Sequence, residues 1–262
     1  MMAIHPSAVI EDGAQIDPLA TVGPFCVVGP QVILAADVVL KSHVVVTGQT
    51  TVGEGTVIFP FAVIGEIPQD LKFKGEGEAS RLVIGKRNRI REHVTMNCGT
   101  EGGGGLTSVG DDGLFMAGCH IAHDAIVGNN VIVVNNAAVA GHCVIEDQVI
   151  IGGLSGIHQW VRVGRGAIIG AVTMVTNDVI PYGLVQAPRG HLDGLNLVGL
   201  KRRGVARGDI TALRAAFQML AQGDGTFHDR AERLGAETES DYVREIVDFV
   251  LADSGRHFLT PK

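Results

Sequence analysis

Residues 109–157 have the sequence VGDDGLFMAGCHIAHDAIVGNNVIVVNNAAVAGHCVIEDQVIIGGLSGI. In this segment a large apolar residue returns at every sixth position, beginning with Val109 and Phe115. A period of six matches neither the 3.6-residue period of an α-helix nor the two-residue period of a β-strand. It is expected of a chain that turns a corner every six residues and points one apolar side chain inward on each side.

The six-residue period continues through most of the chain. It holds over residues 4–64, 84–96 and 109–175, which gives 26 apolar positions. Three six-residue sides make a triangular coil of 18 residues, and parallel strands of successive coils stack about 4.8 Å apart. Hexapeptide repeats of this kind are typical of an all-β left-handed parallel β-helix. We therefore predict that fold, with between eight and nine coils.

Two segments interrupt the period, one near residues 65–83 and one near residues 97–108. Loops that leave a solenoid commonly form its binding face. The first segment also concentrates charged and aromatic side chains in QDLKFKGE (69–76). We therefore expect the loops to belong to a functional site rather than to be tolerated surface insertions.

The pattern changes after the last repeat, where apolar residues take the spacing of amphipathic helices. Residues 201–223 and 241–255 show this spacing, and a shorter helix is expected around His228–Leu234. We predict two domains, a β-helix over residues 1–186 and a C-terminal α-helical domain over residues 187–262. The helices would cap the last coil, whose strand edges would otherwise be exposed.

Composition and charge exclude several classes of protein. Hydrophobic residues make up 46% of the 262 residues but aromatic residues only 5%, which suits thin aliphatic layers better than a globular core. The N-terminus lacks the regions of a signal peptide, and no run of about twenty apolar residues predicts a membrane span. A formal net charge of −7 argues against general nucleic-acid binding. We expect a cytoplasmic protein.

The four cysteines do not predict a metal or redox site. Cys26, Cys119 and Cys143 share one position of the repeat, where a small apolar side chain belongs. These residues and Cys98 show no C-x-x-C spacing. Buried, reduced thiols are therefore expected.

Three histidines are predicted to gather on one side of the β-helix. The hexapeptides that contain His123, His142 and His158 each begin one full coil after the last, so they fall on the same side of three successive coils. His120 adjoins them, and all lie outside the inward-pointing positions. A solvated polar face would explain one such histidine. A cluster in adjacent coils instead indicates proton transfer, because imidazole titrates near neutral pH.

A zinc site is the alternative for this histidine cluster. Zinc requires neutral imidazoles that converge at about 2.1 Å on one ion. The trimeric carbonic anhydrases of this architecture use a pair of histidines five residues apart, and no two histidines here have that spacing. No cysteine or second carboxylate supports a metal. Proton transfer is favoured, and we predict no bound metal.

Six segments of the chain together resemble one family of enzymes. They are QDLKFKGE (69–76), GKRNRIREHVT (85–95), HIAHDAIVGN (120–129), NNAAVAGHCVIED (135–147), IIGGLSGIHQ (150–159) and NLVGLKRRG (196–204). Hexapeptide transferases in general share the period but not these segments together. Throughout its length the chain resembles the UDP-N-acetylglucosamine O-acyltransferases that begin lipid A biosynthesis.

The resemblance implies a reaction and its partners. Enzymes of this family transfer an (R)-3-hydroxyacyl chain from acyl carrier protein to the 3-hydroxyl of UDP-N-acetylglucosamine. They are homotrimers with active sites in the clefts between subunits. The acyl donor is a phosphopantetheine thioester on the carrier protein, so no separate cofactor is implied.

The resemblance also implies roles for individual residues. His123 is expected to be the general base, with Asp124 beside it, and Gly141 to present a backbone N–H to the thioester oxygen. A sugar hydroxyl is a poor nucleophile at pH 7, so a base and a fixed oxyanion donor suit the chemistry independently. The other matching residues are His142, which joins the catalytic group, and the substrate-binding residues Asp70, Lys72, His120, His158, Gln159, Asn196, Arg202 and Arg203.

Three positions depart from what is common in the family, and a fourth concerns the length of the acyl chain. Val198 stands where the family often has a glutamate near the nucleotide, Arg189 where it often has a histidine, and Cys98 where an arginine is common. Ala171 matches the acyl-chain ruler, where glycine accompanies longer chains. An added methyl group in a close-packed groove opposes a longer chain. We therefore expect a preference for a medium-length hydroxyacyl chain.

Three alternative functions stay open from the sequence. The related N-acyltransferases, which acylate an amino sugar, carry a uridine-binding domain before the repeats, and here the repeats begin at Ile4. A small-molecule acetyltransferase that uses coenzyme A is the second alternative. A non-catalytic β-helix that binds surfaces is the third; regular arrays of threonine on one face would indicate it, and none is present.

Overall fold

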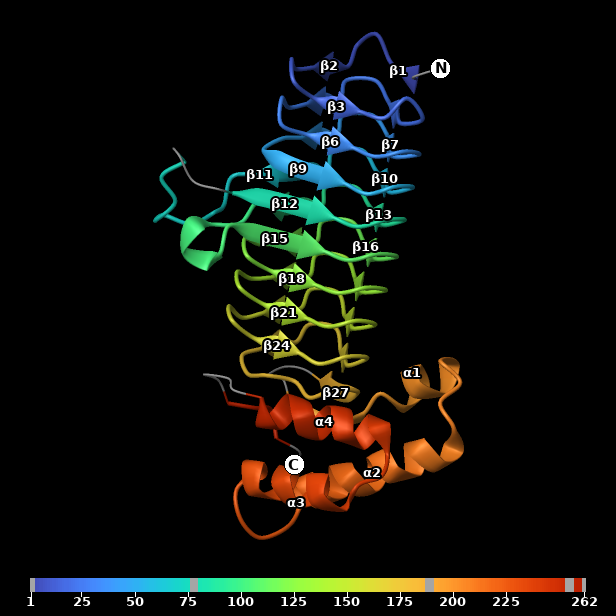
Figure 1. Ribbon diagram of the computed structural model, residues 1–262, viewed down its shortest axis with the longest axis vertical. Coiled ribbons are helices and arrows are strands. Elements are labelled where there is room, and N and C mark those ends of the chain that lie inside the picture. The colour runs from blue at the N-terminus through green and yellow to red at the C-terminus, as the bar shows by residue number, and fades with distance from the viewer. Residues whose placement is uncertain (1–2, 76–79, 187–190, 253–256, 261–262) are drawn as a thin grey trace.

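The computed structural model describes residues 3–75, 80–186, 191–252 and 257–260. Within them the chain forms the predicted left-handed parallel β-helix, a three-sided prism with one β-sheet on each side (Figure 1). Each of the 26 predicted apolar positions lies in one of the strands β1 to β26, in chain order. Within the regular coils each strand pairs with the strand one full coil later, as Val22 with Leu40 and Ile121 with Val139. The predicted period and register are therefore confirmed.

The three sheets are defined by their strands. The first sheet contains β1 (Ala3–Ile4), β4 (Thr21–Val22), β7 (Val39–Leu40), β10 (Val57–Ile58), β13 (Arg89–Ile90), β16 (Leu114–Phe115), β19 (Ile132–Val133), β22 (Ile150–Ile151), β25 (Ile168–Ile169), β27 (Gly183–Gln186) and β28 (His191–Leu195). The second contains β2 (Val9–Ile10), β5 (Val27–Val28), β8 (Val45–Val46), β11 (Val63–Glu66), β14 (Thr95–Asn97), β17 (His120–Ile121), β20 (Ala138–Val139), β23 (Gly156–Ile157) and β26 (Met174–Val175). The third contains β3 (Gln15–Ile16), β6 (Ile33–Leu34), β9 (Gln49–Val52), β12 (Arg81–Ile84), β15 (Leu106–Val109), β18 (Ile126–Val127), β21 (Val144–Ile145) and β24 (Arg162–Val163).

The apolar repeat positions fill the inside of the prism. Val139, Ile145 and Ile151, on three consecutive sides of one coil, are at most 1% exposed. Burying an aliphatic side chain of this size stabilises a fold by about 1.5–3 kcal/mol, which explains why the period holds so closely. The four cysteines are buried and form no disulfide, as predicted. Burial raises the pKa of the Cys119 thiol to about 12, so this cysteine is unreactive at neutral pH.

The two interruptions of the period leave the prism as loops. We call the segment between β11 and β12 the first loop and the segment between β14 and β15 the second loop. The second loop contains the short 3-10 helix η1 (Glu101–Gly103). Both loops project from the same edge of the prism (Figure 1). The Asn97 side-chain amide donates to the carbonyl of Ile67 at 3.0 Å and so ties the start of one loop to the other.

The described part of the chain contains four helices after the coils, of which α2, α3 and α4 lie beneath the last coil and α1 lies beside it (Figure 1). They are α1 (Leu197–Arg202), α2 (Arg207–Ala221), α3 (Phe227–Glu237) and α4 (Asp241–Leu251). The sequence predicted α2, α3 and α4 but neither α1 nor the antiparallel strand β28, whose apolar residues do not follow the six-residue period. Among the described residues, no helix combines the length and apolarity that crossing a bilayer requires.

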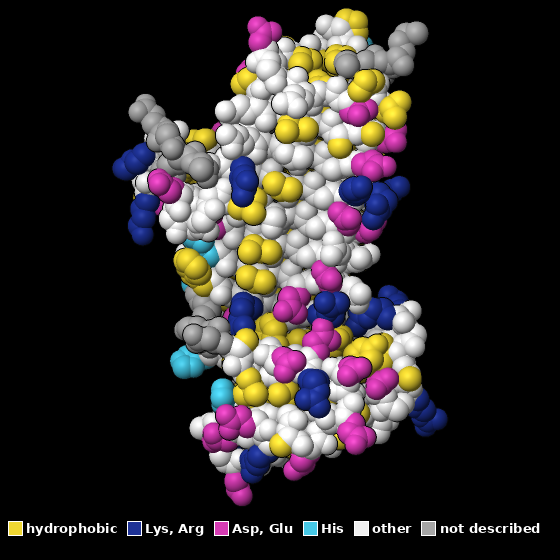
Figure 2. Space-filling model, viewed as in Figure 1, with side chains coloured by type: hydrophobic (Ala, Val, Ile, Leu, Met, Phe, Trp, Pro, Cys, Tyr) yellow, Lys and Arg dark blue, Asp and Glu magenta, His cyan; other side chains and the backbone are white. Residues whose placement is uncertain are grey.

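Polar contacts join the helices to the last coils. The Tyr182 hydroxyl donates to the Glu245 carboxylate, and Arg165 Nε lies 2.6 Å from Glu245 Oε1. Arg162 pairs with the buried Asp178 at 2.7 Å and covers the ring of Phe249. Figure 2 shows basic and acidic side chains side by side along this junction. The helical segment is therefore held against the prism rather than tethered loosely to it.

Candidate active site

Three successive coils place the predicted histidines along one corner of the prism. His123, His142 and His158 follow β17, β20 and β23, which are neighbours in the second sheet. The backbone N–H of His142 donates to the carbonyl of His123 at 3.1 Å, so consecutive corners stack directly. The prediction that the three histidines share one side of the β-helix is confirmed.

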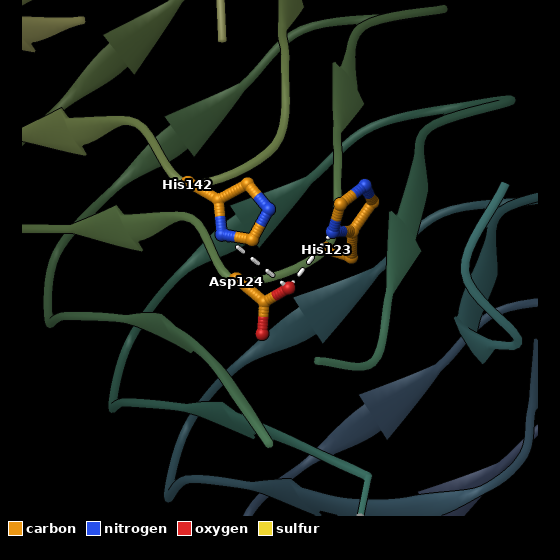
Figure 3. Close-up of side chains that lie close together, drawn as sticks. All are labelled: His123, Asp124 and His142. Atoms are coloured by element: carbon orange, nitrogen blue, oxygen red, sulfur yellow. Dashed lines mark hydrogen bonds and ion pairs between the residues drawn. The ribbon is translucent and has the colours of Figure 1, made fainter. Parts of the chain in front are cut away.

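His123 and Asp124 form the centre of this corner (Figure 3). His123 Nδ1 lies 2.8 Å from Asp124 Oδ2, and both residues are 5% exposed. Asp124 adopts a left-handed backbone conformation with φ of 59°, which turns its carboxylate back toward the histidine. A carboxylate at Nδ1 fixes the imidazole with its proton on that nitrogen and leaves Nε2 as the acceptor. The pair therefore has the geometry of an oriented general base.

His142 packs between His123 and an aromatic residue that sequence reasoning missed. Its ring meets that of His123 edge-on, with centroids 5.0 Å apart, and stacks on Trp160 at 3.8 Å and 6°. His142 Nδ1 also lies 3.6 Å from Asp124 Oδ2. Burial lowers the pKa of His142, although the Asp124 charge opposes this shift. A neutral imidazole at this position can form hydrogen bonds without adding positive charge beside His123.

Gly141 brings backbone against the face of His123. A Cβ atom on Gly141 would lie 2.6 Å from Cε1 and 2.8 Å from Nε2 of His123. Real Cβ atoms do not approach other atoms this closely, so a side chain at this position would displace the imidazole. The structure thus gives a steric reason for glycine at this position. By the resemblance, it is the position whose backbone N–H faces the thioester oxygen.

The first and second loops wall a pocket beside the histidines. Its volume is about 490 Å³, and its lining includes Asp70, Lys72 and Phe73 of the first loop with His142 and Trp160 of the corner. Asp70 Oδ1 accepts the backbone N–H of Lys72 at 2.9 Å, which shapes the turn of the loop. The predicted loop residues Asp70 and Lys72 therefore line the same pocket as His142, although they are far from it in sequence.

The remaining predicted residues of this corner differ in their surroundings. His120 Nδ1 lies 2.7 Å from the Thr95 hydroxyl, and burial lowers the pKa of this histidine. His158 and Gln159 are exposed on the following coil. His158 Nδ1 lies 3.2 Å from the carbonyl of Gln159. These two residues lie along the same corner, one coil beyond His142.

A second group of predicted residues lies elsewhere in the chain. Ala171 follows β25 of the first sheet, so it lies on a different side of the prism from His158, as predicted. Asn196 is buried and caps α1, where its side chain accepts from Gly199 N–H and donates to the carbonyl of Gly166. Arg202 and Arg203, at the end of α1, are exposed.

Within a single chain, this second group lies apart from the histidine corner. Figure 1 shows α1 and the loop with η1 on opposite sides of the molecule. Of the described residues that line the pocket at His142, none belongs to the group of Ala171, Asn196, Arg202 and Arg203. Val198 is 61% exposed on α1, and Cys98 is buried with its pKa raised by burial. Arg189 lies outside the described residues.

The hydrogen bonds of Asp124 help to decide whether the histidine corner could bind zinc. His123, Asp124 and His142 bring possible ligand atoms within 4.8 Å of one another. Asp124 Oδ1, however, accepts the backbone N–H of Thr100, and Oδ2 accepts from the Thr100 hydroxyl and from His123 Nδ1. These donors already take most of the acceptor positions of the Asp124 carboxylate. The arrangement fits an oriented imidazole better than a metal ligand set.

A buried imidazole–carboxylate pair at the corner of a hexapeptide-repeat β-helix, beside an open pocket, defines an acyltransferase of the hexapeptide class. Comparisons with known proteins agree with this class. Residues 7–42 match the model of the bacterial transferase hexapeptide (six repeats), and residues 178–259 match that of UDP-N-acetylglucosamine O-acyltransferase, domain 2.

Individual relatives narrow the class to one family. The acyl-(acyl-carrier-protein)–UDP-N-acetylglucosamine O-acyltransferase of Paracoccus denitrificans is 68% identical over 78% of this chain and 77% of its own length. That of Rhizobium etli is 49% identical over 98% and 94%. The UDP-N-acetylglucosamine acyltransferase structure from Campylobacter jejuni is 38% identical, with a TM-score of 0.92 over 99% and 100% of the two chains. The chain belongs to the UDP-N-acetylglucosamine O-acyltransferase family.

Proposed function

We propose that this protein transfers an (R)-3-hydroxyacyl chain from acyl carrier protein to the 3-hydroxyl of UDP-N-acetylglucosamine, the first step of lipid A biosynthesis, with His123 as the general base. The observation that carries the assignment of the base is the 2.8 Å contact between His123 Nδ1 and the buried Asp124 carboxylate. Figure 3 shows the other ring nitrogen of His123 on the side away from Asp124. That nitrogen is the one placed to receive a proton.

The reaction follows from these positions. His123 Nε2 accepts the proton of the sugar hydroxyl as its oxygen attacks the thioester carbonyl. The negative charge that develops on the carbonyl oxygen is stabilised by the backbone N–H of Gly141, a donor fixed in place before the reaction. The tetrahedral intermediate then collapses, the C–S bond breaks, and the phosphopantetheine sulfur takes the proton from His123. Asp124 stabilises the transient imidazolium and keeps its charge throughout.

A homotrimer completes the site in this proposal. Helix α1 and the loop with η1 lie on opposite sides of one chain (Figure 1), and the described lining of the pocket at His142 includes none of Asn196, Arg202 and Arg203. A neighbouring copy, related by the symmetry of a closed ring, would bring its α1 to this corner. The two arginines would then bind the diphosphate, for which guanidinium groups offer paired donors.

The proposal also covers the acyl donor, the residues that contact the substrates and the cellular location. The phosphopantetheine arm belongs to the carrier protein, so the reaction as written requires no cofactor of the enzyme. Lys72 and Asp70 would contact the sugar and its phosphate in the pocket that they line, and His120, His158 and Gln159 would border the bound substrates. We place the enzyme in the cytoplasm, where an acyl carrier protein and a nucleotide sugar are both present.

One assay tests this function directly. The purified protein is incubated with UDP-N-acetylglucosamine and hydroxyacyl carrier proteins of graded chain length, and the products are analysed by mass spectrometry. We expect a single 3-O-acylated product and the release of free carrier thiol. Acylation only of a 3-amino sugar, or only from coenzyme A thioesters, would contradict the proposal and favour one of the related transferases.

A further inference from the structure

The second loop contains a residue that acts directly on the His123–Asp124 pair. Thr100 donates its backbone N–H to Asp124 Oδ1 at 2.8 Å and its hydroxyl to Oδ2 at 2.6 Å. Asp124 Oδ2 also accepts from His123 Nδ1 at 2.8 Å. One carboxylate therefore has three donors, and two of them belong to Thr100. The hydroxyl and His123 share the same oxygen.

The direction of the Thr100 hydroxyl proton is fixed by its other partner. The backbone N–H of Gly103 donates to the same hydroxyl oxygen at 3.1 Å, because Thr100 caps η1. The hydroxyl hydrogen is therefore free to point only at Asp124. Since both Thr100 groups donate to it, the carboxylate is left with the acceptor role. His123 must then present its Nδ1–H to it.

The second loop is shaped around this carboxylate. A Cβ atom on Gly103 would lie 2.1 Å from Cγ of Asp124, so η1 can approach only because this residue is glycine. Thr107, in β15 where the chain rejoins the prism, accepts the backbone N–H of Asp124 at 2.8 Å. The second loop thus holds the side chain of Asp124 and the adjoining strand β15 holds its backbone, and Thr100 is buried at the loop contact.

We propose that Thr100 is a positioning residue for the acyl transfer. By holding the Asp124 carboxylate, it keeps His123 in the Nδ1–H tautomer and leaves Nε2 to accept the proton of the sugar hydroxyl. A competing partner is nearby, because His142 Nδ1 lies 3.6 Å from the same Asp124 oxygen. Without the Thr100 hydroxyl, the carboxylate turns toward His142 and His123 loses its fixed tautomer. The inference rests on the proposed role of His123 as base.

Three variants test this role in the assembled enzyme. Thr100→Val removes the hydroxyl, Thr100→Ser keeps it, and Thr56→Val is the matched control. Thr56 is also buried, donates its hydroxyl to the carbonyl of Gly85, and accepts the backbone N–H of Asn88, but it lies outside the site. The measurements are kcat and KM for the nucleotide sugar, the melting temperature, and the ¹⁵N NMR shifts of the His123 ring nitrogens.

We expect Thr100→Val to lower kcat on the order of tenfold or more, the size expected when a hydrogen bond to a charged group is lost. KM should change little, the Nδ1–H tautomer should lose its dominance, and Thr100→Ser should restore both kcat and tautomer. Thr56→Val should lower only the melting temperature. If Thr100→Val fails to fold, Thr100→Ala removes the same hydroxyl with less bulk.

Two results would overturn the proposal. One is a folded Thr100→Val or Thr100→Ala enzyme with normal kcat and an unchanged His123 tautomer. The other is a Thr100→Ser enzyme as impaired as Thr100→Val, which would indicate packing rather than the hydroxyl. The NMR signal does not require turnover. A wild-type protein that transfers no acyl chain would therefore count against the proposed function and not against the role of Thr100.

Discussion

The regular coils and the two loops contribute different parts of the same site. In the coils, a position in the sequence determines a position in space: His142 and Trp160 occupy equivalent positions of successive coils and stack at 3.8 Å. In the loops no such register exists. Thr100 nevertheless contacts Asp124 through two hydrogen bonds, and Asp70 lines the pocket beside His142.

This difference shows how a repeat protein can carry a functional site. A stack of coils is rigid because each strand is bonded to its neighbours, so it can hold a side chain such as that of His123 in a fixed position. The same regularity leaves its corners open to solvent. The loops supply the pocket walls and the hydrogen bonds that the repeat cannot, and they leave the prism in the two coils that precede the coil of His123.

The largest expected effect on kcat comes from removing the imidazole that the coils hold in place. His123→Ala should lower kcat by about 10²–10⁴-fold, as expected for the loss of a general base. The variant should keep its fold, because His123 occupies a corner and not the inside of the prism. Steady-state kinetics with circular dichroism measure both quantities. Near-normal turnover would mean that another residue takes the proton, with His142 the first candidate.

A second prediction concerns a different corner of the coils, between the first and second sheets. Ala171→Gly should shift the preferred hydroxyacyl chain toward greater length, because removing a methyl group lengthens a close-packed groove. The expected change is roughly tenfold in the product ratio when two carrier-bound chains differing by two to four carbons compete. Ala117→Gly is the control, since Ala117 occupies the same repeat position three coils earlier. An unchanged ratio in Ala171→Gly would remove this residue as the ruler.

The smallest expected effect concerns the ring stack at the corner. Trp160→Ala should lower kcat about two- to tenfold, because an aromatic pair contributes about 0.5–1.5 kcal/mol beyond its buried area. Trp160→Phe should retain most of the activity. Phe61→Ala removes another exposed corner ring, stacked on His93 away from the pocket, and should leave kcat unchanged. Equal losses in Trp160→Ala and Phe61→Ala would show that corner rings act through stability alone.

Much of the fold could be predicted from the sequence because the period of six is a direct consequence of the geometry. Each predicted apolar position lies in a strand, and the spacing of His123 and His142 placed them on adjacent corners. The same reasoning could have found Trp160, which lies one full coil after His142. It was missed because an exposed corner accepts almost any side chain.

The contacts of the loops could not be predicted in this way. Thr100 lies in a segment without a period, so its distance from Asp124 depends on the path of the loop and on the absence of a side chain at Gly103. Strand β28 and helix α1 were missed for a related reason. Leu192 and Leu195 fall outside the period, and α1 is only six residues long, too short for helical spacing to stand out.

The central claim is that His123 accepts the proton of the sugar hydroxyl, and chemical rescue tests it most directly. His123→Gly leaves a space at the base that added imidazole can enter. We predict that the variant is nearly inactive and that imidazole restores turnover, with rates that rise with the pKa of substituted imidazoles. His142→Gly should show no such dependence. If imidazole failed to rescue His123→Gly but rescued His142→Gly, the proton would pass through His142, and the assignment of His123 as the base would be wrong.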